Sequence, residues 1–222
     1  MKRYVVGALK ALKWILIIFF ASSIISVIAL RWIPVWITPL MVIRSVQPLA
    51  HGEAPHGWHH TLVSLDEMSP WMPKAVVASE DGHFYEHHGF DFEEINKALE
   101  ERASGKRERG ASTITQQTAK NVFLWPGHSL VRKGLEAYFT VLIELFWSKE
   151  RILEVYLNSI EMGPNIYGTE AAAKQLFGKS AADLTKRQCA LIAVSLPNPL
   201  KRDPSHPTAY MNRRASTIMK WM

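Results

Sequence analysis

The chain has 222 residues, of which 48% are hydrophobic and 21% are charged. This composition can build a packed core, and it excludes an intrinsically disordered chain. The net charge of +6 and the eight tryptophans suit an anionic partner or membrane surface, although charge alone fits an ordinary basic protein equally well. The single cysteine, Cys189, excludes an internal disulfide framework, and its apolar neighbours predict a small buried side chain.

An uncharged stretch, "WILIIFFASSIISVIAL", runs from Trp14 to Leu30. A helix that rises about 1.5 Å per residue needs roughly 20 apolar residues to cross a bilayer, and the uncharged residues beyond Arg31 supply the remainder. We therefore expect a transmembrane anchor over 14–36. A cleaved signal peptide is the alternative, but "ALRWIPVW" has bulky residues where a small-x-small cleavage site would be needed.

Basic residues precede this anchor, and they predict its orientation. They are Lys2, Arg3, Lys10 and Lys13. The positive-inside rule then places residues 1–13 in the cytoplasm and everything after the anchor on the other side of the membrane. Residues 37–64 are expected to be a membrane-proximal linker. Its histidines favour a solvated loop over a metal site, because no cysteine joins them.

From Ser69 onward, segments with helical periodicity follow one another and strand signals are sparse, so residues 65–222 are expected to be mainly α-helical. Ser69, Asp91 and Ser148 are candidate N-caps, and Gly105 is a candidate helix end. A charged loop, "GKRERG", separates two of these helices.

Polar residues gather at four places in these apolar surroundings. Glu80 comes just after the apolar turn "AVVA", with Ser79 between them, and partial burial would raise its pKa toward the range of a general base. In "GASTITQQTAKN", helical spacing puts Thr113, Gln117 and Lys120 on one face, which could hydrogen-bond a sugar and bind a phosphate. The third group is Arg132, Lys133 and Glu136, and the fourth is Glu154, Asn158 and Glu161. For each, an ordinary surface or helix-end position is the alternative.

His83 and His87 lie four residues apart, a spacing that can bind zinc on a helix. Acid–base chemistry at Glu80 is the competing interpretation of the same stretch, "SEDGHFYEHHGF". Two carboxylates, several cations and many hydrogen-bond donors on a membrane-tethered domain suit glycosyl transfer from a lipid pyrophosphate. In that reaction a base deprotonates the acceptor hydroxyl and cations stabilise the departing pyrophosphate.

These residues resemble the peptidoglycan glycosyltransferases of family 51 over about residues 65–210. "EDGHFYEHHG" is similar to the first signature of that family, E-D-x-x-F-x-x-H-x-G. "RGASTITQQTAKN", "RKGLEA", "KERILEVYLN" and "LTKRQCALIAVSLPNP" are similar to the next four, in order. Two positions depart from the pattern: Gln188 stands where a glutamate is usual and Leu176 where an aromatic is common.

The resemblance implies a mainly α, lysozyme-like glycosyltransferase domain with head and jaw lobes behind a single transmembrane helix. It implies polymerisation of lipid II into β-1,4-linked glycan with inversion. Glu80 would be the base on the acceptor 4-hydroxyl and Glu136 the second essential carboxylate. The groups implied to bind the pyrophosphate and sugar are Thr113, Gln117, Lys120, Asn121, Arg132 and Lys133. Site support would come from Asp81, Phe84, His87 and Ser112, whereas His83 and His88 occupy variable positions.

The implied partners are lipid II, the growing glycan chain and membrane lipid, with other cell-wall synthesis proteins left open and no nucleic acid expected. The implied location is the bacterial inner membrane with the catalytic domain in the periplasm, and moenomycin is the expected inhibitor. A divalent cation, Mg²⁺ or Mn²⁺, could assist at the pyrophosphate, but no ligand spacing predicts one. No S-x-x-K transpeptidase motif is present, so transpeptidation is not expected.

Two other functions compete with this one. A lytic enzyme of the same fold would need a general acid and no phosphate site, and the cations Lys120, Arg132 and Lys133 argue against it. A non-catalytic membrane scaffold would not need Glu80 and Glu136.

Overall fold

The computed structural model describes residues 2–105, 110–127 and 129–222. Residues 106–109 of the predicted charged loop lie outside the described residues, as do the side chains of Lys2 and Arg3. The helices are α1 (Lys2–Leu30), α2 (Pro39–Val46), α3 (Trp71–Glu80), α4 (Phe92–Ala103), α5 (Ile114–Phe123), α6 (Leu130–Phe146), α7 (Lys149–Ser159), α8 (Thr169–Phe177), α9 (Lys186–Ser195) and α10 (Ala209–Ile218), with short 3-10 helices η1 (Gln47–His51), η2 (Leu65–Glu67) and η3 (Ala181–Asp183). The expected mainly helical fold is confirmed.

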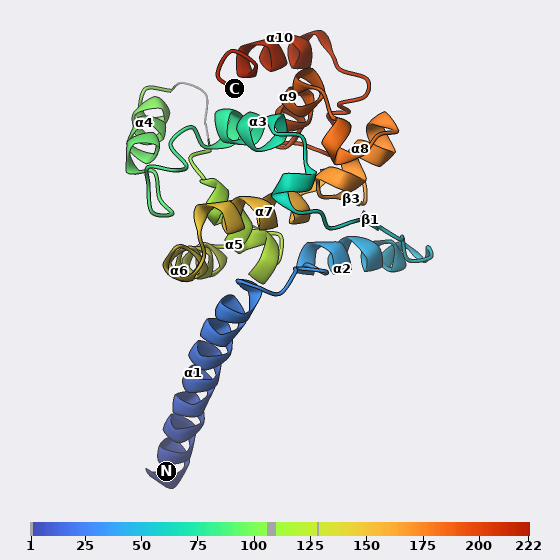
Figure 1. The fold of residues 1–222 in the computed structure, drawn as a ribbon. Helices are drawn as coiled ribbons and strands as arrows, with labels where there is room; N and C mark the ends of the chain where they lie inside the picture. The colour runs from blue at the N-terminus through green and yellow to red at the C-terminus, as the bar shows by residue number, and fades with distance from the viewer. Residues whose placement is uncertain (1, 106–109, 128) are drawn as a thin grey trace.

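Helix α1 extends away from the body of the molecule (Figure 1). Among the described residues, its segment Leu9–Leu30 is the one helix long and apolar enough to cross a membrane, with a mean hydropathy of 2.3. Only 11% of that segment is buried, so it is not a core helix. It fits a single-pass anchor that begins and ends earlier than the expected 14–36. The helix stops at Leu30 because Pro34 disfavours helical geometry in the residue before it.

The last part of α1 is docked against the helical body. Ser23 Oγ and Tyr138 OH lie 2.7 Å apart, and Trp147 Nε1 donates to the carbonyl of Val27 at 2.7 Å. Arg151 Nη2 donates to the carbonyl of Leu30 at 2.9 Å. The anchor is therefore fastened to α6 and α7 as well as being covalently attached.

Two helices form the centre of the core. Every residue of α9 from Cys189 to Ser195 is buried, as its sequence "CALIAVS", apolar on most sides, requires. Helix α7 is similarly buried from Val155 to Ser159. Helix α9 packs against α3 and α10, and α5 packs against α6 and α7. The prediction for Cys189 is confirmed, and burial raises the pKa of its thiol to about 11.

The strands are short, as the sparse strand signals predicted. β1 (His59–His60) pairs in parallel with β3 (Ile166–Tyr167), which pairs antiparallel with β2 (Glu161–Gly163). The side chain of Asn158 makes two hydrogen bonds with the backbone of Val63: it accepts from the amide at 3.0 Å and donates to the carbonyl at 2.8 Å. These contacts hold the chain entering the domain against α7.

The predicted helix caps are partly correct. Asp91 and Ser148 cap α4 and α7 as expected, and Gly105 is left-handed just beyond α4. The prediction that Ser69 caps α3 is wrong, because Pro70 occupies the cap position and no side chain caps that helix. Gln188 accepts from the Thr185 amide in the capping box of α9, so the amide does there what a glutamate would do.

Candidate active site

Two clefts meet between the helices that carry the predicted residues. The larger, about 950 Å³, is lined by α3, α10 and the loop after α3, and it contains Glu80. The smaller, about 540 Å³, is lined by α5 and α6. Ser112 lines both clefts. Gln117 Nε2 donates to Glu80 Oε2 at 3.2 Å. This hydrogen bond from α5 to α3 connects a residue of the smaller cleft with a residue of the larger one.

Glu80 is the last residue of α3 and lies partly buried at the edge of the larger cleft. Burial raises its pKa, because the charged carboxylate loses hydration. The hydrogen bonds from Gln117 and Ser79 oppose that rise, as do the more distant charges of Arg214 and Arg202. The result is a carboxylate with an elevated pKa at the edge of a cleft.

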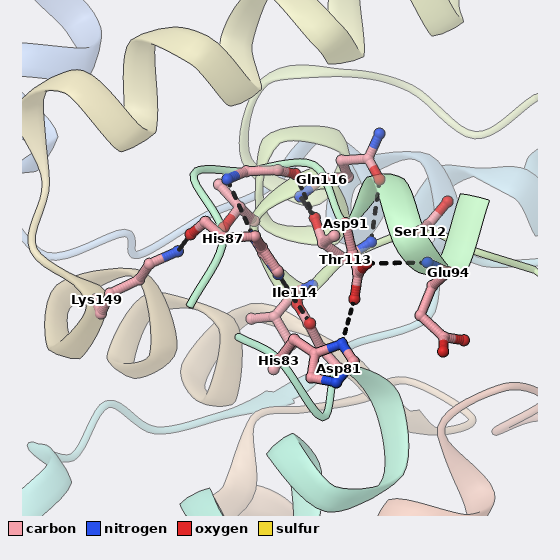
Figure 2. Close-up of polar contacts among 12 residues, drawn as sticks. Asp81, His83, His87, Asp91, Glu94, Ser112, Thr113, Ile114, Gln116 and Lys149 are labelled. Carbon is pink, nitrogen blue, oxygen red and sulfur yellow. Dashed lines mark hydrogen bonds and ion pairs between the residues drawn. The ribbon is translucent and has the colours of Figure 1, made fainter. Parts of the chain in front are cut away.

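Asp81 has a different role from its neighbour. Its carboxylate accepts from the amide of Ile114 at 2.9 Å and from His87 Nε2 at 2.8 Å (Figure 2). Ile114 is the first residue of α5, so Asp81 ties the end of α3 to the start of α5. This tie fixes the end of α3, which carries Glu80, relative to α5, which carries Gln117.

His87 completes this support. Its Nδ1 accepts from the Gly89 amide at 3.1 Å, so the ring proton is on Nε2, where it is donated to Asp81. Both ring nitrogens are thereby occupied, which leaves none for zinc. His83 lies apart, with its Nδ1 2.8 Å from Asp91. Phe84 is fully buried, with Lys149 Nζ 4.6 Å from its ring centroid, and is part of the core below the loop.

Gly89 explains the glycine of the first signature. Its φ is +90°, and a Cβ there would lie 2.8 Å from Thr140 Cγ2. Its carbonyl accepts from the hydroxyl of Thr113 at 2.7 Å. The loop can pass this close to α6 and α5 only with glycine at this position.

The expected polar face of Thr113, Gln117 and Lys120 forms only in part. Thr113 is the N-cap of α5, and its buried hydroxyl accepts from Gln116 N while it donates to Gly89. The helix begins one residue later, at Ile114, so the Thr113 hydroxyl is committed within the protein. Gln117, Lys120 and Asn121 do line the smaller cleft.

The smaller cleft is cationic. Glu136 is buried, and its carboxylate pairs with Arg132 Nη1 at 2.8 Å and with Lys133. Burial lowers the pKa of Lys120, and the neighbouring cations lower it further against the opposing effect of Glu136. Lys133 Nζ also reaches Ser112 Oγ at 3.5 Å. Arg132 Nε is buried without a hydrogen-bond partner among the described residues. This arrangement can hold an anion while Glu136 keeps two of the cations in place.

The fourth polar group has a mainly structural role. Glu154 pairs with Arg151, and Asn158 holds Val63. Glu161 accepts from Arg44 Nε at 3.2 Å, and both residues line the smaller cleft. Sequence reasoning missed Arg44, although an isolated arginine in the apolar "PLMVIRSV" was a signal. It also missed Arg214 of α10, which lines the larger cleft.

The side chains at the junction do not suit a resident divalent metal. Within the described residues, no group of three or more His, Cys, Asp or Glu side chains could hold a metal ion. Both oxygens of Glu136 already bind cationic side chains. The histidines of the linker are likewise not gathered around one point; His60 Nε2, for example, lies 2.9 Å from the carbonyl of Asn158.

A partly buried carboxylate beside a cationic cleft, on a helical domain behind an apolar helix, provides the chemical groups that a group-transfer enzyme needs. Comparison with known proteins identifies the group. A family model described as "Transglycosylase" matches residues 47–222. The chain belongs to this family and is a glycosyltransferase.

Relatives named "Biosynthetic peptidoglycan transglycosylase" cover most of the chain. The protein from Bacteroides thetaiotaomicron is 60% identical over 96% of this chain and 86% of its own length. The proteins from Caulobacter vibrioides and Bdellovibrio bacteriovorus are each 52% identical, over 92% and 93% of this chain and 86% and 84% of their own lengths. The chain is therefore similar to peptidoglycan transglycosylases along nearly its whole length.

Proposed function

We propose that this chain polymerises lipid II into β-1,4-linked peptidoglycan strands, with Glu80 as the general base. The observation that carries the proposal is the meeting of the two clefts at the Glu80–Gln117 hydrogen bond. A base with an elevated pKa then lies beside a set of cations suited to a pyrophosphate.

In the proposed reaction the acceptor 4-hydroxyl loses its proton to Glu80 as its oxygen attacks the anomeric carbon of the donor. The bond from that carbon to the pyrophosphate oxygen breaks, and the electron pair leaves with the pyrophosphate. Lys120, Arg132 and Lys133 would stabilise the added negative charge, as preorganised cations do for a leaving group. Attack opposite the leaving group inverts the anomeric configuration.

Glu136 would act through the cations. Its buried carboxylate holds Arg132 and Lys133, and an unpaired buried arginine would be costly. Lys120 lies partly buried in the same cleft and carries a lowered pKa. A pyrophosphate would return that pKa toward its ordinary value, so binding of the donor and protonation of Lys120 would be coupled.

We also propose that the enzyme is a single-pass protein of the bacterial inner membrane, with a cytoplasmic N-terminus and a periplasmic catalytic domain. The exposed apolar segment Leu9–Leu30 and the basic residues Lys10 and Lys13 support this orientation. Moenomycin is the expected inhibitor. The chain has no S-x-x-K motif, so we propose glycosyl transfer without transpeptidation.

The test is polymerisation of lipid II in detergent by the wild-type protein and by Glu80→Gln. The amide keeps the size of the side chain but cannot accept the proton, so the rate should fall about a hundredfold or more. Equal rates for the two proteins would reject Glu80 as the base. Degradation of finished glycan without polymerisation would reject the direction of the reaction and favour a lytic enzyme.

A further inference from the structure

The larger cleft contains Glu80, and one of its walls is made by α10 and the turn that follows it. The residues of this wall are Arg214, Thr217, Ile218 and Trp221. Their spacing of three, four and seven residues puts them on one face of a helix. The backbone bond from Trp221 N to the carbonyl of Ile218, 2.9 Å, continues the turn and carries Trp221 along the same face.

The two clefts differ in charge and size. The smaller is lined by four cationic side chains and two carboxylates, whereas the larger is lined by three cationic side chains, four carboxylates and His83. The larger cleft therefore has no excess of positive charge to attract a pyrophosphate. Its volume, about 950 Å³, lies at the upper end of the range for small-molecule sites and exceeds what one sugar ring needs.

Exposed aromatic rings line this cleft. Trp221 is 79% exposed and Tyr85 is 59% exposed, and both line this cleft. One face of a pyranose ring presents C–H groups that pack on an aromatic ring, while its hydroxyls remain free for hydrogen bonds. Arg214, exposed on the same wall, can donate several hydrogen bonds to such hydroxyls or to a carboxylate.

We propose that Trp221 and Arg214, with Tyr85, form a saccharide-binding platform that holds the glycan strand beyond the reaction centre and so sets how many transfers precede release. This inference rests on the proposed function, because it takes the occupant of the cleft to be the glycan handled at Glu80. The continuity of the platform with Glu80 in one cleft favours a sugar chain over any other occupant.

The experiment measures the length distribution of glycan made from lipid II by Trp221→Ala, Trp221→Phe and a matched control, Trp58→Ala. Trp58 is a partly exposed tryptophan that lines none of the clefts described above. Loss of one stacking contact should shorten the mean glycan length about threefold to tenfold in Trp221→Ala. Trp221→Phe should retain most of the length, and Trp58→Ala should make glycan of wild-type length.

Glu80→Gln, assayed beside these variants, helps to distinguish a failure of the proposed function from a failure of the saccharide-binding platform. A wild-type protein that makes no polymer overturns the proposed function itself. A wild-type protein that polymerises, together with equal glycan lengths for Trp221→Ala and Trp58→Ala, overturns the platform alone. Because Trp221 is exposed, its replacement should not unfold the domain, and thermal unfolding of each variant checks this. If Trp221→Ala did unfold, Arg214→Gln must shorten the glycan for the platform to stand.

Discussion

Glu80 and Asp81 are neighbours in the chain, yet their surroundings give them different roles. Asp81 is directed into the protein, where an amide and a histidine use its oxygens. Glu80 accepts from the flexible side chains of Gln117 and Ser79 at the edge of a cleft, where a substrate could replace them. Burial raises the pKa of both carboxyls, and because the protein already uses the oxygens of Asp81, Glu80 is the one of the two that we propose as the base.

The pH dependence of glycosyl transfer should change when the hydrogen bond from Gln117 to Glu80 is removed. A base must be deprotonated, so the rate should fall as the pH drops below the raised pKa of Glu80. Gln117 lowers that pKa, so Gln117→Ala should raise it further and move the acidic limb of kcat/KM to higher pH. Measurement of kcat/KM for lipid II between about pH 4 and 8 would show this. An unmoved acidic limb would mean that the titrating group is not Glu80.

At the scale of elements, the site depends on how α3, α5 and α6 are held. Asp81 joins α3 to α5, and Thr115 of α5 donates to Glu144 of α6 at 2.6 Å. The core behind them depends on a close contact of α7 with the turn before α8. Gly168 there has φ +78°, and a Cβ would lie 2.6 Å from the carbonyl oxygen of Asn158.

Gly168→Ala should therefore destabilise the domain without touching the clefts. The left-handed backbone costs a non-glycine residue about 1–3 kcal/mol, and the clash with Asn158 adds to this. We expect the Tm in detergent to fall by about 4 °C or more. Gly57→Ala is the control, because a Cβ at Gly57 meets nothing within 4 Å. Equal Tm values for the two variants would contradict the role of this contact.

At the scale of the whole molecule, one helix, α6, both lines the smaller, cationic cleft and contacts the anchor helix α1. Helix α6 carries Arg132, Lys133 and Glu136 in its first half, and Tyr138 beyond them bonds to Ser23 of α1. Figure 1 shows α5 and α6 close to the end of α1, with α3, α9 and α10 farther away. A lipid-linked pyrophosphate would thus meet the protein on the side where the anchor attaches.

The proposed orientation can be tested with single cysteines. The native Cys189 is fully buried and should not react, so the wild type supplies the background. In spheroplasts, a membrane-impermeant maleimide should label Lys201→Cys, which is exposed on the domain, but should label Lys10→Cys only after lysis. Labelling of Lys10→Cys in intact spheroplasts would reverse the orientation. A mature chain that begins after Leu30 would instead indicate a cleaved signal peptide.

The amino-acid sequence by itself determined the long apolar helix, most of the other helices and the candidate site residues. These follow from local features: an uncharged apolar stretch, a period of about 3.6 residues, and caps such as Asp91 and Ser148. The signatures similarly marked Glu80, Glu136 and the cations before any contact was known.

Only the tertiary structure decided which of these side chains are free to act. In the fold, the hydroxyl of Thr113 caps α5 and the carboxylate of Asp81 accepts from the first amide of α5. Arg44 and Arg214 come from distant segments and line the clefts. The reason is physical: periodicity depends on neighbours within a few residues, whereas burial, pKa and the walls of a cleft depend on segments that can lie more than a hundred residues apart. The cleft that runs from Glu80 to Trp221 joins 80 with 221, and no local pattern in the chain relates those two positions.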